Sequence, residues 1–384
     1  MNSIYFDNGS TSFPKAPRLG KVMGDFIEEG AFNINRGNYE GAYNLQSLVL
    51  ETRELLCKLF NFSNSKNVIF TPSITYSLNY FIKGFLKKGD HIIISSMEHN
   101  AVIRPLTQMK NLGISYDIVK ANNEGEINPK NFYPFIRENT KAIITTHCSN
   151  VCGTIIPIEE IGEICKENNI YFVVDAAQSA GMIPIDMKKS NIDFLAFTGH
   201  KGLLGPQGIG GFIISDDLAL QIEPLIAGGT GSLSDSEFLP EFLPDRFESG
   251  TLNLPGIVGL NHSLNYILKE GIENIFNKKL ELTKYFLEEI KKLTHINIIG
   301  KKDLQNRSSV VSLDFENIDN ATVAFLLDSE YNIMTRVGLH CSPMAHKTLS
   351  TFPKGTVRFA FSHFNTKEEI NICIKAIQTI ISQI

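Results

Sequence analysis

The chain has 384 residues, of which 43% are hydrophobic, and it carries a formal net charge of −5 at pH 7. A chain of this size and composition can bury a large core and exceeds what one compact lobe usually holds, so we expect two lobes. Its basic residues are scattered along the chain, which argues against nucleic acid or a membrane as the partner and favours a small molecule.

The first residues, MNSIYFDNGS, contain no basic segment followed by an apolar run, so we expect no signal peptide. No stretch approaches the ~18–20 apolar residues that a membrane span needs. The six cysteines do not resemble a disulfide framework, and Cys148 and Cys152 lack a second pair to complete a zinc site. The sequence therefore predicts a cytoplasmic protein with reduced thiols and no metal.

Short β-rich apolar runs alternate with helical patterns from about residue 66 to residue 215. This alternation is typical of βαβ units and predicts an α/β lobe with a doubly wound, mostly parallel sheet. Apolar residues recur at helical spacing in segments 77–86 and 158–167. The expected strands are residues 67–71, 91–96, 115–120, 142–147, 171–175, 194–198 and 211–215.

The composition changes at residues 226–255, which are rich in Gly, Ser, Glu and Pro but keep interspersed Phe and Leu. We interpret this segment as a long ordered loop, a type of segment that is usually functional. The rest of the chain predicts a smaller α+β lobe. Its expected elements are a helical stretch from 255 to about 293, a strand at 308–315, a helix at 321–327, a strand at 357–362 and a helix from 366.

Residues that follow sheet strands are the candidates for chemistry, because open α/β sheets bind ligands at the carboxyl ends of their strands. Lys201 follows an apolar strand and opens a Gly-rich turn. It is either a surface lysine or a Schiff-base lysine, whose amine must be partly desolvated to become nucleophilic. Asp175 ends another strand and is either a helix cap or the carboxylate that keeps a pyridine nitrogen protonated. Together they meet both requirements of a pyridoxal 5′-phosphate site.

Lys201 and Asp175 are two of many positions, spread over nearly the whole chain, that match one known family. The sequence resembles the class V aminotransferase family, in particular the cysteine desulfurase and selenocysteine lyase branch of the fold-type I pyridoxal enzymes. This resemblance implies a large cofactor-binding domain at residues 15–255 and a small α+β C-terminal domain at residues 256–384. Residues 1–14 are expected to belong to the small domain. The matching segments, besides those of Asp175 and Lys201, are Tyr5-Phe6-Asp7-Asn8, Arg36-Gly37, Phe70-Thr71 through Asn79, Glu98-His99-Asn100, Ser149-Asn150-Val151, Arg246-Phe247-Glu248-Ser249-Gly250-Thr251 and Arg336-Val337-Gly338-Leu339-His340-Cys341.

The resemblance gives each candidate around the cofactor ring a role. His99 matches the residue that stacks on the pyridine ring and moves protons, although a histidine after a strand is often only a hydrogen-bonded loop residue. Asn150 and Gln178 match positions that hydrogen-bond the phenolic oxygen of the cofactor. Ala177 matches the small residue on the opposite face of the ring.

The phosphate of the cofactor needs amides and hydroxyls, which a helix N-terminus supplies together with the positive end of its dipole. Ser73, Ile74 and Thr75 lie at such a predicted terminus. The family more often has Gly, Ala and Thr here, so Ser73 and Ile74 depart from its pattern, whereas Thr75 keeps the hydroxyl. Thr198 and His200 match further phosphate ligands.

Substrate binding is expected from two arginines. Arg358 matches the family's clamp for the α-carboxylate of an amino acid, which a planar guanidinium can bind through two hydrogen bonds; the alternative is a surface arginine on a strand. Arg336 is expected to be a second basic group near the substrate. Asn150 is also expected to contact the substrate. Thr251 matches a residue that reaches the phosphate of the neighbouring subunit, which implies a homodimer.

Cys341 decides which reaction is expected. It lies in a predicted loop between Arg336 and His346, an exposed, electropositive setting that favours a reactive thiolate over a buried hydrophobic cysteine. The expected enzyme is a pyridoxal-phosphate-dependent cysteine desulfurase, a transferase of sulfur-containing groups that converts L-cysteine to L-alanine and leaves a persulfide on Cys341. Its expected catalytic residues are Lys201, Cys341 and His99.

Two alternatives stay open at this point. One is a selenocysteine lyase, since the same residues can release selenium from L-selenocysteine. The other is a role outside desulfuration, as a class V transaminase or β-lyase on another amino acid or as a partner-binding protein. The compact loop around Cys341 resembles that of relatives which need a sulfur-acceptor protein. Tyr39 stands where the family commonly has histidine, and Cys148 is either a second thiol near the site or a packed cysteine.

Overall fold

The computed structural model describes residues 3–34, 39–233 and 235–383. The Arg36-Gly37 part of the resemblance lies outside these ranges. Within them, none of the helices is both long enough and apolar enough to cross a membrane.

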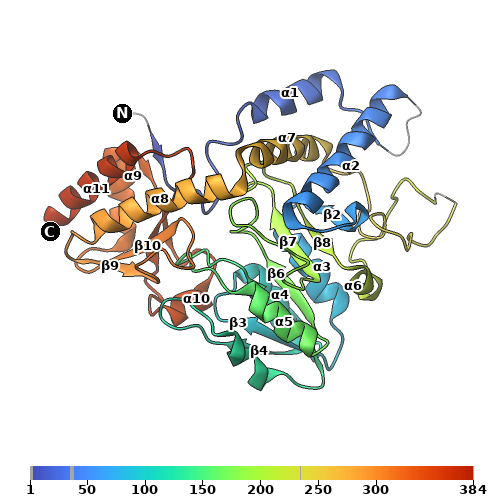
Figure 1. Cartoon of the computed structure of the whole chain (residues 1–384), viewed down its shortest axis with the longest axis horizontal. Coiled ribbons are helices and arrows are strands. Elements are labelled where there is room, and N and C mark those ends of the chain that lie inside the picture. The colour runs from blue at the N-terminus through green and yellow to red at the C-terminus, as the bar shows by residue number, and fades with distance from the viewer. Residues whose placement is uncertain (1–2, 35–38, 234, 384) are drawn as a thin grey trace.

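A seven-stranded sheet lies at the centre of the larger part of the molecule (Figure 1). Its strand order is β2-β8-β7-β6-β5-β3-β4, and only β8 runs antiparallel to its neighbours. The predicted doubly wound, mostly parallel sheet is thereby confirmed, and each predicted strand is found with its ends shifted by at most two residues. The strands are β2 (Val68–Thr71), β3 (His91–Ser95), β4 (Ser115–Val119), β5 (Thr140–Thr146), β6 (Tyr171–Asp175), β7 (Phe194–Thr198) and β8 (Gly210–Ile214).

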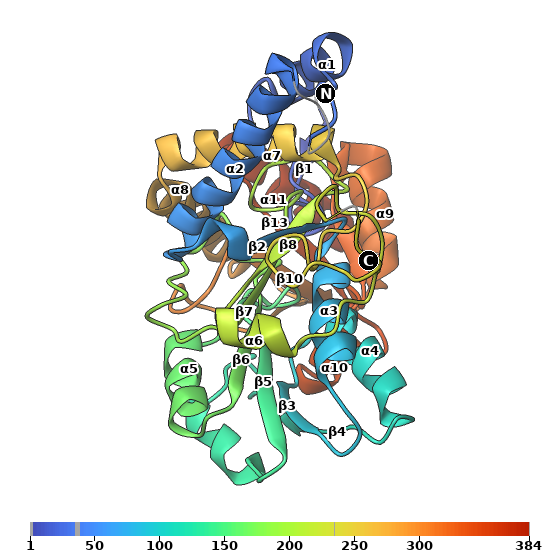
Figure 2. The same ribbon diagram turned by 90° about the vertical axis from the view of Figure 1, so that its right-hand side faces the viewer.

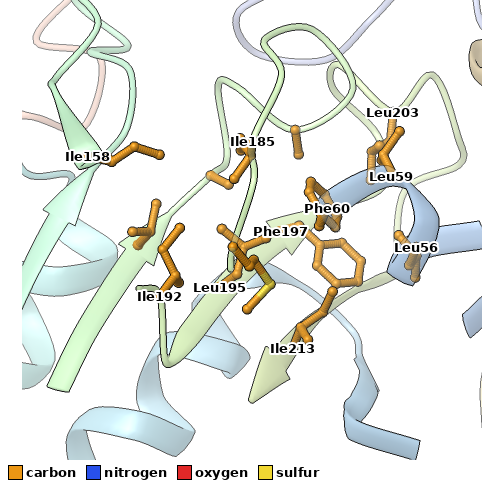
Figure 3. Close-up of a cluster of buried hydrophobic side chains, with 14 of the residues drawn as sticks. Leu56, Leu59, Phe60, Ile158, Ile185, Ile192, Leu195, Phe197, Leu203 and Ile213 are labelled. Atoms are coloured by element: carbon orange, nitrogen blue, oxygen red, sulfur yellow. The ribbon is translucent and has the colours of Figure 1, made fainter. Parts of the chain in front are cut away.

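Helices cover both faces of this sheet, so most of its strands are buried along nearly their whole length and are rich in apolar residues. Alternate side chains of one strand enter different cores: Leu195 and Phe197 pack on one face, while Phe194 and Ala196 pack on the other. Figure 3 shows Phe197 of the first core beside Phe60 of α2, with Leu195 in the same cluster. The flanking helices are α1 (Leu19–Glu29), α2 (Glu40–Phe60), α3 (Ile74–Phe85), α4 (Asn100–Lys110), α5 (Ile158–Glu167), α6 (Asp216–Gln221) and α7 (Leu254–Glu270), with two 3₁₀ turns at Ser65–Asn67 and Pro129–Phe135.

A four-stranded antiparallel sheet, in the order β12-β13-β10-β9, forms the other part of the molecule (Figures 1 and 2). Its main strands and helices agree with the predicted α+β pattern, but the short strands β9 and β12 were not predicted. The division of the chain at residue 255 stays a prediction. The elements of this part are α8 (Ile272–Ile290), β9 (Ile296–Ile299), β10 (Val310–Phe315), α9 (Asn320–Tyr331), β12 (Arg336–Gly338), α10 (Pro343–Thr348), β13 (Thr356–Ala360) and α11 (Lys367–Ser382).

The start of the chain joins the two parts. Strand β1 (Ile4–Tyr5) pairs in parallel with β11 (Ile333–Met334), and the Phe6 amide and carbonyl bond to Met334 and Ala360. Beyond β1 the chain crosses to the larger sheet, where the Ser12 amide donates to the His200 carbonyl at 3.0 Å. Residues that precede the first large helix are therefore held against the carboxyl end of β7.

The segment predicted as a long ordered loop contains no helix or strand in its described residues before α7 begins. A buried ion pair ties its end to the larger sheet. The Glu248 carboxylate accepts from Arg53 of α2 through both oxygens, at 2.9 and 2.7 Å, and from the amide of Phe70 in β2 at 2.7 Å. Because this charge is paired and hydrogen-bonded, it can be buried at the point where the loop returns to α7.

Candidate active site

Most of the predicted site residues meet at the carboxyl ends of the larger sheet's strands, where the smaller sheet adjoins it. His99 follows β3, Asn150 follows β5, Asp175 ends β6 and Lys201 follows β7. Arg358 comes from β13 of the smaller sheet. The strand order brings β3, β5, β6 and β7 side by side, and this adjacency gathers side chains that are far apart in sequence.

Lys201 and Asp175 form the charged centre of this site. Burial, together with the positive charge of Arg358, lowers the pKa of the Lys201 amine to about 8, although Asp175 partly offsets this. Burial raises the pKa of the Asp175 carboxyl, against the opposing effects of the Ala177 amide, which donates to it at 2.8 Å, and of Lys201. Lys201 can thus supply an uncharged, nucleophilic amine near neutral pH. Asp175 is a desolvated acid that a cationic partner would stabilise.

His99 caps helix α4 instead of projecting freely from a loop. Its Nδ1 accepts a hydrogen bond from the Ala101 amide at 3.0 Å, which leaves the proton of the neutral ring on Nε2. Burial and the nearby Lys201 cation lower the pKa of His99 to about 4. The ring is therefore neutral near pH 7 and has a fixed tautomer and orientation.

A hydroxyl bridges the two arginines. Ser10 Oγ accepts from Arg336 and from Arg358, each at 2.8 Å, and donates to Asp7 Oδ1 at 2.8 Å. Arg358 also donates to Asp7 Oδ1 at 2.8 Å and to the Asn150 carbonyl at 3.0 Å. Among the described residues, none accepts a hydrogen bond from the buried Nε of Arg358. This guanidinium is rigidly held and still has a donor to offer.

The N-terminal segment also fixes the remaining side of the site. Gln178 donates to the Gly9 carbonyl at 2.9 Å, which orients its amide. A side chain at position 9 would meet the Arg358 guanidinium at 2.9 Å, so only glycine allows this close approach. Lys15 donates to the carbonyl of His200 at 2.7 Å. The start of the chain is therefore part of the site.

The loop that carries Cys341 reaches the site from the smaller sheet. The Asn150 amide donates to the His340 carbonyl at 2.7 Å and accepts from the Ser342 hydroxyl at 2.8 Å. The Cys341 carbonyl accepts from the Asn100 amide at 2.9 Å, and the Cys341 thiol lies 3.8 Å from Arg336 Nη2. The thiol is thus held next to Arg336.

Cys341 differs from the other five cysteines, because it is exposed and they are buried. Cys148 lies in a small apolar cluster with Met182 and Ile183, and its Sγ is 3.7 Å from the Gly153 carbonyl. Burial raises the pKa of the Cys148 thiol to about 12. Cys148 is therefore a packed cysteine at a strand end, and Cys341 is the accessible thiol.

Three of the predicted phosphate residues, Ser73, Ile74 and Thr75, form the start of helix α3. Ser73 is the cap residue before Ile74, and the first amides of a helix have no acceptor within it. Gly210 of β8 lies against this turn, since a Cβ there would be 3.2 Å from the Ile74 nitrogen. Within the described chain, the buried Nδ1 of His200 has no hydrogen-bond partner. Thr75 is exposed beside them and Thr198 is buried at the end of β7.

Thr251 lies apart from this group. It is exposed and lines a separate cavity of about 260 Å³ at the end of the long loop. Other residues of this cavity include Asn33, Gly229 and Gly250. Within one chain, Thr251 is therefore not joined to the other predicted phosphate residues.

Three residues of the site received no role from the sequence, although Asp7 and Glu98 lie in segments that matched the family. Asp7 and Ser10 connect the arginines, and Glu98 is buried close enough to Asp175 for the two carboxyls to interact electrostatically. One oxygen of Glu98 accepts from the Thr146 amide at 2.9 Å and from the Ser95 hydroxyl. Its other oxygen is buried without a partner among the described residues. Burial raises the pKa of the Glu98 carboxyl to about 8, so this residue is protonated at neutral pH.

Replacing Glu98 by glutamine is expected to flatten the pH dependence of stability. Between the ordinary pKa of glutamate and about 8, the folded chain holds a proton that the unfolded chain has released, so folding becomes less favourable as pH rises. Glutamine stays neutral in both states. Relative to pH 5, the free energy of unfolding of the variant at pH 8 should exceed that of the wild type by about 2–4 kcal/mol.

Urea unfolding of the cofactor-free proteins at pH 5, 6.5 and 8 measures this difference. Glu163→Gln is the matched control, because Glu163 is exposed on α5 and should leave the pH dependence of the wild type unchanged. Parallel pH dependences in wild type and Glu98→Gln would show that Glu98 is ionised in the folded protein.

Comparison with known proteins identifies the family. The model of the class V aminotransferase family matches residues 4–372, and the chain belongs to this family. The resemblance predicted from the sequence is thereby confirmed. A probable cysteine desulfurase of Methanothermobacter thermautotrophicus is 32% identical over 98% of this chain and 94% of its own. One of Borreliella burgdorferi is 33% identical over 99% and 92%.

The fold agrees with this assignment. The apo structure of a cysteine desulfurase from Thermococcus onnurineus NA1 covers 100% of this chain and 95% of its own, with a TM-score of 0.93 and 30% sequence identity. The chain therefore has the fold-type I architecture that was expected from the sequence.

Proposed function

We propose that this chain is a pyridoxal-phosphate-dependent cysteine desulfurase that converts L-cysteine to L-alanine and forms a persulfide on Cys341. The observation that carries this proposal is the exposed Cys341 thiol beside Arg336, in the same site as the Lys201 amine and the buried Asp175. The names of the relatives with which the chain aligns over nearly its full length support the same activity.

The residues present fit pyridoxal 5′-phosphate. Asp175 is a buried carboxyl that needs a cation, and a protonated pyridine nitrogen would be one. The α3 amides with Ser73 and Thr75, the buried hydroxyl of Thr198 and the His200 ring would hold the phosphate. His99 and Ala177 would lie on the two ring faces, and Gln178 and Asn150 would face the phenolic oxygen. When bound, this cofactor supplies an electron sink for negative charge at Cα.

Substrate binding is assigned to the arginine pair. Arg358 would hold the α-carboxylate through its free Nε, while Asp7 and Ser10 keep the guanidinium in place. Arg336 adds positive charge between this carboxylate and the Cys341 thiol. A substrate bound here presents its sulfur to Cys341 and its Cα proton to Lys201.

Two residues would move protons. The lowered pKa of Lys201, about 8, allows its amine to remove the Cα proton near neutral pH. His99 is neutral and has its proton on Nε2, so it can donate that proton or hand it on without first changing tautomer.

The sulfur transfer is a displacement at the substrate sulfur. Cys341 Sγ forms a bond to that sulfur while the substrate Cβ–S bond breaks, and the electron pair of that bond stays with the carbon skeleton. Protonation of the carbon skeleton then gives alanine, and Cys341 carries the persulfide. No oxidant is required, because the substrate sulfur is transferred from carbon to Cys341 Sγ while the carbon skeleton keeps the electron pair of the broken bond.

The proposal includes the cellular setting expected from the sequence. Thr251, exposed and apart from the other phosphate residues, would reach the active site of a second copy in a homodimer. A sulfur-acceptor protein, or a reductant in vitro, would take the outer sulfur from the exposed Cys341. The cysteines, all free thiols, agree with a reducing compartment such as the cytoplasm.

The test is the release of alanine and sulfide from L-cysteine by the holoenzyme under reducing conditions. Wild type is compared with Cys341→Ala and with Cys148→Ala, a control that removes a buried thiol from the same region. We expect equal alanine and sulfide from wild type and from Cys148→Ala, and a loss of at least about 10²-fold in Cys341→Ala. Mass spectrometry of the wild type without reductant should show a mass increase of about 32 Da on Cys341, which is the mass of one sulfur atom.

The same assays with L-selenocysteine separate the alternatives. Turnover of selenocysteine but not of cysteine would replace the proposal by a selenocysteine lyase. Consumption of a keto acid without sulfide would replace it by a transaminase.

A further inference from the structure

The backbone at the nucleophile has an uncommon conformation. His340 and Cys341 are consecutive residues with positive φ angles, 49° and 60°, in the left-handed region that side chains with a Cβ seldom adopt. Such residues persist only where the surrounding structure holds them. The contacts of this loop therefore show what fixes the thiol.

The strongest of these contacts come from one side chain of the larger sheet. Asn150 binds the loop on both sides of Cys341, because it donates to the His340 carbonyl and accepts from the Ser342 hydroxyl. Asn150 is 8% exposed and Ser342 is 0% exposed, so water does not compete for these bonds. The Asn100 amide, at the start of α4, holds the Cys341 carbonyl between them.

The Asn150 side chain has a further hydrogen-bond donor besides the one that holds the loop. A side-chain amide has two hydrogens to donate, and Asn150 uses one of them for the His340 carbonyl. The other remains for the cofactor oxygen or the substrate that Asn150 would face. Asn150 can therefore touch the reacting molecule and the thiol loop at the same time.

We propose that Ser342 is a positioning residue: its hydroxyl and the Asn150 amide form a clamp that holds Cys341 in the left-handed conformation required for attack on the substrate sulfur. This inference rests on the proposed function, since it assigns Cys341 the role of nucleophile. Ser342 does not touch the substrate and acts only through Asn150 and the loop.

Loss of the Ser342 hydroxyl has a defined consequence. Asn150 Oδ1 would be left buried without its donor, and the strained residues 340–341 would lose one of their restraints. The thiol would then spend less time at the reacting position. Because Arg358 and Lys201 are unchanged, we expect kcat for persulfide formation to fall about 10–100-fold with little change in KM.

The test uses the holoenzyme and three variants. Ser342→Ala removes the hydroxyl, and Ser342→Thr keeps it on a residue that suits the extended φ of −133°. Ser263→Ala is the matched control, because it removes a buried serine hydroxyl from α7, where Ser263 donates to the Leu260 carbonyl. For each we measure kcat and KM, and hydrogen exchange at the amides of Asn100 and Ser342.

Exchange at these two amides reports the loop directly, since Asn100 donates to the Cys341 carbonyl and Ser342 to the Leu339 carbonyl. We expect Ser342→Ala to exchange at least about tenfold faster at both and to lose kcat, whereas Ser342→Thr recovers most of both and Ser263→Ala matches wild type. Unchanged kcat and exchange in Ser342→Ala, or a rise in KM alone, would overturn the clamp.

The two proposals fail separately. If the wild type forms no persulfide, the proposed function is wrong, and the exchange rates alone still decide whether Ser342 holds the loop. If the wild type forms persulfide and Ser342→Ala does so at the same rate, only the clamp is wrong.

Discussion

Lys201→Ala is expected to abolish turnover and the visible absorbance of the cofactor bound to lysine. The amine at position 201 is the group placed just after the end of β7, and its lowered pKa of about 8 leaves about a tenth of it uncharged at pH 7. Under the proposed function, removing it would take away both the covalent attachment of the cofactor and the base for the Cα proton. We expect turnover to fall by at least about 10⁴-fold, measured with absorbance spectra of the reconstituted variant.

The nearby Lys15 provides a strict control. Burial lowers the pKa of Lys15 to about 8 as well, but its Nζ is already bound to the His200 carbonyl and to the Thr11 and Ser12 hydroxyls. Lys15→Ala should therefore keep the absorbance of the lysine-bound cofactor. If that absorbance persists in Lys201→Ala and disappears in Lys15→Ala, the roles assigned to the two lysines are reversed.

Arg358→Lys is expected to have the second largest effect. The guanidinium binds Asp7, Ser10 and the Asn150 carbonyl, and its unpartnered Nε would be the donor to a substrate carboxylate under the proposed function. A lysine ammonium keeps the charge but not this planar fork, so it cannot hold all these groups at once. We expect kcat/KM for L-cysteine to fall about 10²–10³-fold, mainly through KM.

Asp7→Asn separates substrate binding from the ion pair. This variant removes the charge that faces Arg358 but leaves the guanidinium and its Nε in place. Initial rates over a range of L-cysteine concentrations should show a much smaller change of KM in Asp7→Asn than in Arg358→Lys. If both variants raise KM equally, Arg358 acts only through Asp7.

The larger sheet was predictable because its strands are buried on both faces. Runs such as residues 194–197 are apolar throughout, and no other local structure accounts for so many of them in regular alternation with helices. Position at the end of a strand also identified Lys201 and Asp175, because the carboxyl edge of a parallel sheet gathers such residues whatever their separation in sequence.

Other features depend on contacts that a sequence pattern does not contain. Strands β9 and β12 have three or four residues each and partly exposed side chains, so their local pattern is weak. The bridge from Ser10 to the two arginines forms only because β1 and β11 pair and bring the chain start to the site. The left-handed conformation of Cys341 is likewise imposed by neighbouring segments and not by its own preference.

Because one cysteine is exposed and five are buried, the accessible thiol of this protein can be measured separately from the others. A thiol-specific reagent added to the native chain meets Cys341 first, and the other thiols become available only when the fold opens. The rapid phase of the labelling then measures the fraction of chains with an intact Cys341, and the total after denaturation measures the amount of chain. Rates of turnover can thus be expressed per functional thiol instead of per mass of protein.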